Sequence, residues 1–95
     1  MEADKKVALV VTTKGNGVFF GYGVPTDRDT IELEQCRMCL YWADEAHGVV
    51  GLAANGVPKG SRVSPAAPRI ILREVYAIMV ATDKARLSWE KEPWS

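Results

Sequence analysis

The alternation of apolar side chains changes parity within residues 30–42, and this change constrains the fold more than any other feature of the chain. Successive side chains of a strand point to opposite faces, so the two halves can share one buried face only if an extra residue lies between them. We therefore predict one long strand with a β-bulge at Glu34 and Gln35. The apolar positions before and after this bulge are Ile31, Leu33, Cys36, Met38, Leu40 and Trp42.

The N-terminal part of the chain has the pattern of a β-hairpin. Residues 6–13 are β-branched and apolar on both faces, which is typical of a central strand covered on each side. An Asn-Gly pair ends at Gly17, and residues 18–24 return as a second strand. Gly21 and Gly23 lie inside that strand and indicate strong curvature or the close approach of another backbone.

The middle of the chain is less regular. Residues 49–53 (VVGLA) are predicted to form a short buried strand, and Asn55-Gly56 a second hairpin turn. Residues 57–68 form an irregular loop rich in proline and glycine, in which only residues 61–63 have a sequence that can pair.

The C-terminal part contains one ambiguous segment and one clear helix. Residues 69–80 fit a helical face in part, but their many β-branched residues favour two strands, 69–72 and 75–81. Thr82 is a good N-cap for a helix over residues 83–92. Ala85 and Trp89 lie four positions apart on that helix, so they can dock it onto the sheet.

Together these segments predict one domain over residues 1–95, with residues 1–5 as a frayed lead-in. The fold class is α+β and mostly β. We expect a strongly curved antiparallel sheet, or a small, partly open barrel, of five to six strands with one C-terminal helix.

The charge balance and the apolar runs limit the classes of partner and the compartment. Twelve basic and twelve acidic residues cancel, which disfavours nucleic-acid binding through counterion release. The N-terminus lacks the apolar segment of a signal peptide, and no apolar run reaches the length of a membrane span. Two cysteines are too few for a disulfide framework, so we expect a cytoplasmic protein without a membrane partner.

Cys36 and Cys39 have the spacing of a metal or redox motif, but the rest of such a site is missing. His47 is the only histidine, whereas structural zinc usually takes a second pair of ligands. In a regular strand, residues three apart face opposite sides, so the two sulfurs diverge. We expect buried cysteines, no metal, no cofactor and no catalytic residue. The alternative is a cysteine enzyme in which His47 acts as the base.

Arg37 is the best candidate for a contact residue. Its odd position turns it away from the apolar even positions and places it near Tyr41, and arginine beside an exposed aromatic is typical of a binding hot spot. Lys59 and Arg62 of the irregular loop extend this predicted contact surface. The competing interpretation is a surface arginine paired with an acidic neighbour on the same strand, Glu32 or Glu34.

Further binding candidates are Arg69 and Trp94. Arg37, Arg62 and Arg69 would hold the phosphates of a nucleotide if the fold brought them together. Trp94, next to the C-terminus, is a candidate for an interface, whereas Trp42 and Trp89 are expected to be buried in the core.

Several segments of the sequence resemble a family of small bacteriophage-encoded proteins classed as a domain of unknown function. The resemblance implies a phage or prophage accessory protein made inside a bacterial cell, and it brings no assigned activity and no catalytic residue. It covers nearly the whole chain from about Val7 onward. The segments that carry it are residues 12–15, 17–22, 31–33, 37–42, 48–53, 60–68, 82–83, 89 and 93–94.

By analogy with other small accessory proteins, the leading hypothesis is a non-enzymatic binder, acting as a homo-oligomer, that inhibits a host protein such as a defence nuclease. A second hypothesis is an oligomeric sponge that sequesters a nucleotide immune signal between subunits. Its arginines would hold the phosphates and an aromatic side chain would stack on the base. The cysteine enzyme is the third hypothesis.

Overall fold

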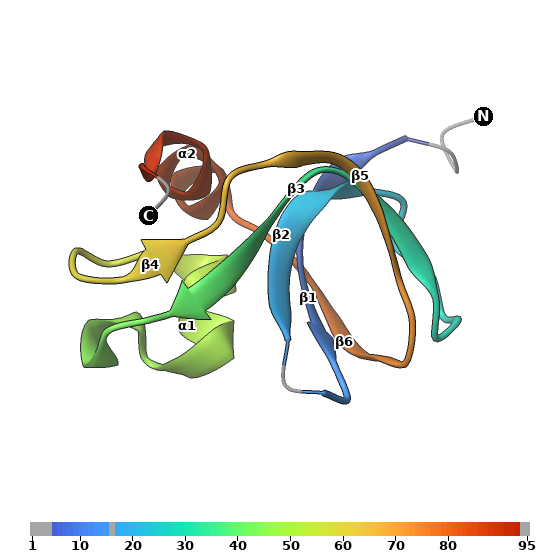
Figure 1. Ribbon diagram of the computed structural model, residues 1–95, viewed down its shortest axis with the longest axis horizontal. Coiled ribbons are helices and arrows are strands. Elements are labelled where there is room, and N and C mark those ends of the chain that lie inside the picture. The colour runs from blue at the N-terminus through green and yellow to red at the C-terminus, as the bar shows by residue number, and fades with distance from the viewer. Residues whose placement is uncertain (1–4, 16, 94–95) are drawn as a thin grey trace.

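A computed structural model describes residues 5–15 and 17–93 of the chain (Figure 1). It shows a curved, antiparallel, six-stranded sheet with the strand order β4-β3-β2-β1-β6, in which β5 also pairs with β3. The predicted fold class is confirmed, with one additional α-helix. The elements are β1 (Val7–Thr13), β2 (Val18–Gly23), β3 (Ile31–Tyr41), the 3-10 helix η2 (Asp44–Ala46), α1 (Gly48–Ala54), β4 (Arg62–Val63), β5 (Ala67–Leu72), β6 (Val75–Val80) and α2 (Asp83–Lys91).

The predicted N-terminal hairpin is present. β1 and β2 pair antiparallel, and the Thr13 N–H donates to the Gly17 carbonyl at 3.0 Å where the chain turns. The glycines of β2 leave room for the neighbouring strand β3, where a larger side chain would collide with it. A Cβ on Gly21 would lie 2.9 Å from the Cβ of Leu33, and one on Gly23 would lie 2.7 Å from the Glu32 carbonyl oxygen. The predicted close approach of another backbone is confirmed.

The predicted bulge in β3 is also confirmed. Phe20 lies opposite Arg37 and Tyr22 lies opposite Glu34, so Gln35 and the residue after it share a single position of β2. Gln35 has φ 50°, a left-handed conformation that non-glycine residues seldom adopt. The bulge turns Arg37 toward the helices.

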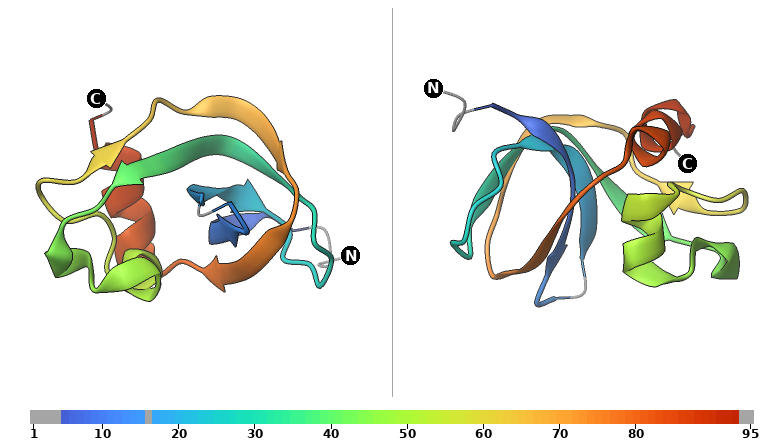
Figure 2. Two further views of the ribbon diagram at one scale, coloured as in Figure 1. Left: turned by 60° about the horizontal axis from the view of Figure 1, so that its bottom comes forward. Right: turned by 180° about the vertical axis from the view of Figure 1, so that it is seen from behind.

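A hydrophobic core lies on each face of the sheet, as predicted for a central β1. One core is built from the strands and lies inside the curve: Leu9, Val11, Ile31, Leu33, Cys36 and Leu72. The other lies between the sheet and the helices: Ala8, Val10, Val18, Phe20, Cys39, Ala46, Leu52, Ala53, Val57, Val63, Ala85 and Trp89. Figure 2 shows the strands bending around one side of the molecule and both helices on the other.

The predictions for residues 49–53 and for Asn55-Gly56 were wrong. Residues 49–53 lie in α1, not in a strand. A run of five apolar residues is compatible with the repeat of a helix and with that of a strand, so the sequence pattern does not distinguish them. Leu52 points into the core, whereas Val50 is exposed. Gly56 ends the helix instead of forming a hairpin: its φ is 95° and its N–H donates to the Leu52 carbonyl at 3.2 Å.

The two-strand interpretation of residues 69–80 is confirmed, and it explains the curvature. β5 pairs with β3, whereas β6 pairs with β1 on the other side of the sheet. Only Arg73 and Glu74 connect the two strands, with Glu74 at φ 55°. Because so short a connection joins two separate edges, the sheet must bend until those edges approach each other. Residues 57–68 are irregular apart from β4 and the first residues of β5.

The predicted C-terminal helix is present as α2. Thr82 caps it, since its Oγ1 accepts a hydrogen bond from the Ala85 N–H at 3.0 Å. Ala85 and Trp89 are fully buried, and the Trp89 ring stacks on Phe20 with 5.2 Å between centroids. No described helix has both the length and the apolar character needed to cross a membrane.

Candidate functional site

Arg37 is buried, with only 7% of its surface exposed, so the prediction that it stands on the surface beside Tyr41 was wrong. The competing interpretation, a surface ion pair with a neighbouring glutamate, was wrong as well. Glu32 pairs with Arg69 at 3.1 Å, and Glu34 pairs with Lys6 at 2.6 Å.

The guanidinium of Arg37 ties α2 to the segment between β4 and β5. Its Nε donates to the Ser64 carbonyl at 2.8 Å, and its Nη1 donates to the Trp89 carbonyl at 2.5 Å. In a continued helix the Trp89 carbonyl would accept from the residue four positions later, but that residue is Pro93, which has no N–H. Arg37 supplies the missing donor and places a positive charge at the negative end of the helix dipole.

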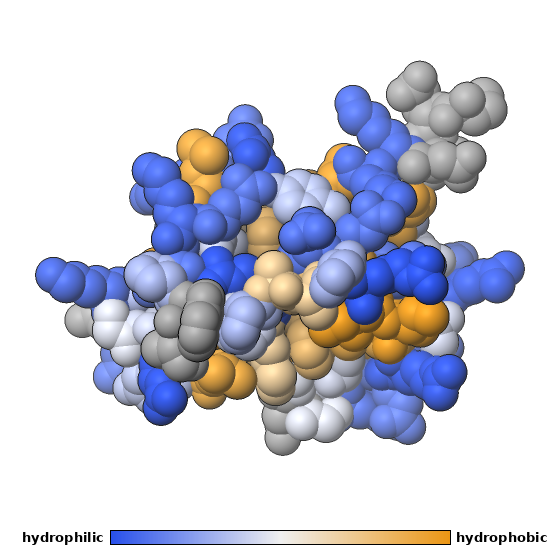
Figure 3. Space-filling view, turned by 45° about the horizontal axis from the view of Figure 1, so that its top comes forward, coloured by the Kyte–Doolittle hydropathy of each residue, from blue (hydrophilic) through white to orange (hydrophobic). Residues whose placement is uncertain are grey.

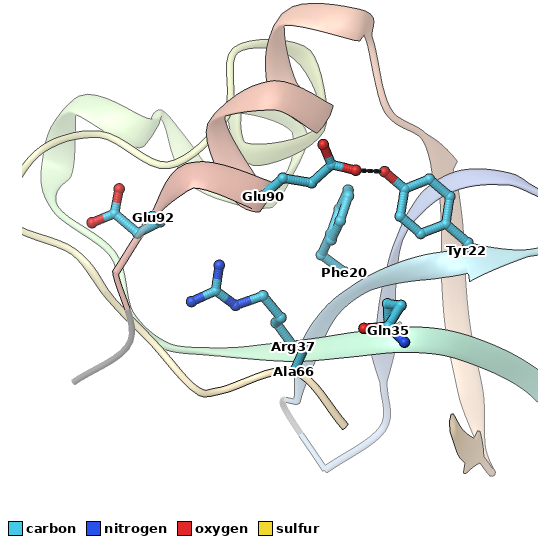
Figure 4. A pocket seen from close by; sticks show the side chains of 7 residues that line it. All are labelled: Phe20, Tyr22, Gln35, Arg37, Ala66, Glu90 and Glu92. Carbon is cyan, nitrogen blue, oxygen red and sulfur yellow. Dashed lines mark hydrogen bonds between the residues drawn. The ribbon is translucent and has the colours of Figure 1, made fainter. Parts of the chain in front are cut away.

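The surroundings of Arg37 form a pocket of about 390 Å³, lined by Phe20, Tyr22, Gln35, Arg37, Ala66, Glu90 and Glu92 (Figure 4). The Tyr22 hydroxyl donates to the Glu90 carboxylate across it. Burial lowers the pKa of Arg37, and the charge of Glu92 opposes this shift. Two carboxylates beside one guanidinium disfavour a phosphate ligand. The geometry therefore assigns Arg37 a structural role.

Three of the predicted contact residues lie at one end of the molecule, where β3 meets β4. Tyr41 and Arg62 are partners in the β3–β4 ladder, and both are exposed, Tyr41 to 56%. Lys59 is exposed in the turn that leads into β4, and the Ser61 hydroxyl secures this turn by accepting from the Ala43 N–H at 2.9 Å. We call Tyr41, Lys59 and Arg62 the aromatic–basic end.

The arginines proposed to hold phosphates are not brought together within one chain. Arg69 pairs with Glu34 in the ladder and Arg62 pairs with Tyr41, which puts about 20 Å of β3 between them. Arg69 belongs to β5, and the β5 ribbon crosses the top of Figure 1. The view from that side shows mainly hydrophilic side chains with smaller apolar patches between them (Figure 3). Trp94 lies outside the described residues; Trp89 is buried, as expected, and Trp42 is half-buried.

The two cysteines lie in different cores on opposite faces of β3, as the strand geometry predicted. Both are free thiols, and burial raises the pKa of each to about 11. They are therefore protonated and unreactive near neutral pH. His47 is exposed. In residues 5–15 and 17–93, no group of three or more histidine, cysteine or acidic side chains could hold a metal ion.

An apolar groove of about 480 Å³, which the sequence did not predict, lies between the first hairpin, α1 and β6. Val50 (70% exposed) and Tyr76 (78% exposed) stand at its rim. The sequence feature that could have indicated this groove is the absence of charged residues from 48–54 and 75–80. Because residues 49–53 were predicted to form a buried strand, Val50 was not expected to be exposed. The lining residues are Thr12, Thr13, Gly17, Val18, Trp42, Val49, Val50, Tyr76, Ala77 and Met79.

Comparison with known proteins identifies a family but no activity. No characterised protein and no solved structure matches the chain significantly. A family model described as a domain of unknown function (DUF6948) matches residues 5–89, which include every strand and most of α2. The chain therefore belongs to the DUF6948 family.

Proposed function

We propose that this chain is a non-enzymatic phage accessory protein that binds and inhibits a protein of the bacterial host, such as a defence nuclease. The aromatic–basic end is the contact surface. The origin and the class of target rest on the resemblance of the sequence to small phage proteins and on analogy with their use. The choice of surface rests on the structure.

The observation that carries this proposal is the pairing of Tyr41 with Arg62 at an exposed strand end. Tyrosine and arginine are the residue types most enriched, with tryptophan, among residues that dominate binding energy. Both belong to a hydrogen-bonded ladder, so their backbones are already ordered and little conformational entropy is lost on binding.

The chemistry of the thiols supports a role without catalysis. A cysteine nucleophile acts as the thiolate, and raising the pKa of Cys36 and Cys39 to about 11 removes that form at neutral pH. Both sulfurs also lie within hydrophobic cores, where a substrate does not reach them.

The test compares the wild type with Tyr41→Ser/Arg62→Ser, and uses Leu87→Ser as a control because Leu87 is exposed to 46% and belongs to α2, not to β3 or β4. Proteins recovered from host extract by the tagged wild type are purified, and their affinity for all three forms is measured by titration calorimetry. We expect the double variant to bind at least about 100-fold more weakly, since two hot-spot truncations cost about 3 kcal/mol or more. The control should bind like the wild type.

A double variant with unchanged affinity, and unchanged inhibition of the recovered protein, would exclude this surface. A thermal-shift screen against cyclic nucleotides tests the sponge hypothesis in parallel. A ligand that raises the melting temperature with the logarithm of its concentration would favour the sponge over the inhibitor.

A further inference from the structure

The most exposed apolar side chains gather on one face of the molecule. Val50 of α1 is exposed to 70%, and Tyr76 and Val80 of β6 to 78% and 64%; these are the three highest values among the large apolar residues that the structure describes. Met79 lies between them and lines both hollows of this face. We call Val50, Tyr76, Met79 and Val80 the β6 face. Contiguous apolar surface of this kind marks an interaction site.

The outer edge of β6 belongs to the same face and offers backbone groups for pairing. In the described part of the chain, β6 pairs only with β1. The Ala81 N–H donates to the Ala8 carbonyl at 2.9 Å, so the backbone groups of Ile78 and Val80 point away from β1 by strand alternation. At the start of this edge, the Asp29 carbonyl accepts a hydrogen bond from the Val75 N–H at 2.9 Å. Residues 26–29 border this edge from Val75 to Ile78 across a hollow of about 290 Å³. The rest of the edge is open, and an open, apolar strand edge is a template for another strand.

We propose that the protein forms a two-fold symmetric homodimer in which β6 pairs antiparallel with β6 of a second copy. A two-fold interface brings one surface patch against itself, so a charged patch would repel its copy. Neither α1 nor β6 contains a charged residue, although the chain has 12 basic and 12 acidic residues. The loop beside β6 carries charges of both signs, Asp27, Arg28 and Asp29. β6 lacks the proline and lysine that usually protect a free edge, and its bulge at Tyr76 lies near one end of the strand.

The shape of the β6 face fits this pairing. A hollow of about 310 Å³ lies beside Val80, lined by Val50, Ala53, Ala54, Met79, Val80 and Thr82. Tyr76 is an extra residue in the β1–β6 ladder, and it lines the groove on the α1 side together with Met79. Antiparallel pairing centred on Ile78 brings Tyr76 of one copy level with Val80 of the other, and so over this hollow. Tyr76 is the most exposed of the large apolar residues and has no aromatic partner among the described residues. In the dimer each copy's tyrosine fills the other copy's hollow.

The first test is the mass in solution by light scattering over a concentration series. We expect twice the 10.4 kDa of one chain for the wild type and for Leu87→Lys, an exposed control on α2. Val80→Lys should dissociate at least ~100-fold more readily, because a buried, unpaired ammonium costs several kcal/mol. A monomeric wild type at 100-micromolar concentration, or a Val80→Lys variant as dimeric as the wild type, would overturn the proposal.

The second test fixes the register. A mixture of Tyr76→Cys and Val80→Cys chains should form a mixed disulfide dimer under mild oxidation, because the pairing sets these positions opposite each other. Each variant alone should cross-link far less. A dimer in which this mixed disulfide does not form would use another interface and refute the pairing. Neither test involves Tyr41 or Arg62, so this inference and the proposed function can fail separately.

Discussion

Replacing Arg37 with methionine tests whether one side chain holds α2 to the rest of the fold. Methionine keeps an unbranched chain in the core and removes the charge and the donors. Two carbonyls then lose their hydrogen-bond donors. In the wild type the Ser64 carbonyl lies 2.8 Å from Nε of Arg37, and the Trp89 carbonyl lies 2.5 Å from its Nη1. Because Pro93 has no N–H, the helix itself cannot restore the second bond.

The expected destabilisation follows from those two bonds. Leaving a buried acceptor without a donor costs about 1–3 kcal/mol. The Trp89 carbonyl is buried and the Ser64 carbonyl only partly so, and together they cost about 2–5 kcal/mol. Relief from burying a charge offsets part of this, since burial already lowers the pKa of Arg37. We expect a net loss of about 2–4 kcal/mol in the free energy of unfolding. For a domain of this size that lowers the melting temperature by roughly 10–25 °C.

Urea unfolding followed by tryptophan fluorescence measures this change. Arg69→Met is the matched control: Arg69 pairs with Glu32 at 3.1 Å on the surface, and we expect its removal to change stability by less than about 1 kcal/mol. In a Pro93→Ala background, a restored N–H can bond the Trp89 carbonyl, so Arg37→Met should be less destabilising there. A loss below about 0.5 kcal/mol for Arg37→Met alone would refute the reasoning.

Two further predictions concern the cysteines and a helix contact. Burial raises the pKa of the Cys36 and Cys39 thiols to about 11 in the fold, against 9.0 for an exposed thiol, so their ionisation favours the unfolded chain. Stability should be unaffected by them below about pH 8 and fall by about 2 kcal/mol per thiol, about 4 kcal/mol for the pair, between pH 9 and pH 11. Urea midpoints of Cys36→Ala/Cys39→Ala should show a shallower fall, and equal slopes would contradict the assignment. In α1, a Cβ on Gly51 would lie 1.5 Å from the Ala46 carbonyl oxygen, so Gly51→Ala should lose at least about 3 kcal/mol in the same assay. Gly15→Ala, where a Cβ meets nothing within 4 Å, is its control, and similar losses in both would show that the contact does not matter.

Most of the sheet could be predicted because local signals agree with the tertiary structure. The parity change in residues 30–42 located the bulge at Gln35, and Asn-Gly located the first hairpin. The capping threonine and the Ala85–Trp89 spacing predicted α2. Each of these patterns constrains several residues at once, so it leaves few alternatives.

Other parts depend on contacts that the sequence does not display. Residues 49–53 fit a strand or a helix equally well, and the helix is selected by packing of Gly51 against η2. Strand parity correctly separated Arg37 from Cys36, but it could not show that α2 covers the face to which Arg37 turns. The proline at position 93 was the available signal, since a helix ending in proline leaves a carbonyl that needs a donor from elsewhere.

The pairing of β1 with β6 joins the first strand of the chain to the last. During synthesis, β1 and β2 can form their hairpin early, but β1 has no strand on its other side until β6 has left the ribosome. Contacts so distant along the chain slow folding, which for domains of this topology takes on the order of milliseconds to seconds. A nascent chain that stalls before β6 therefore presents the unpaired edge of β1 to its surroundings, and such edges promote aggregation.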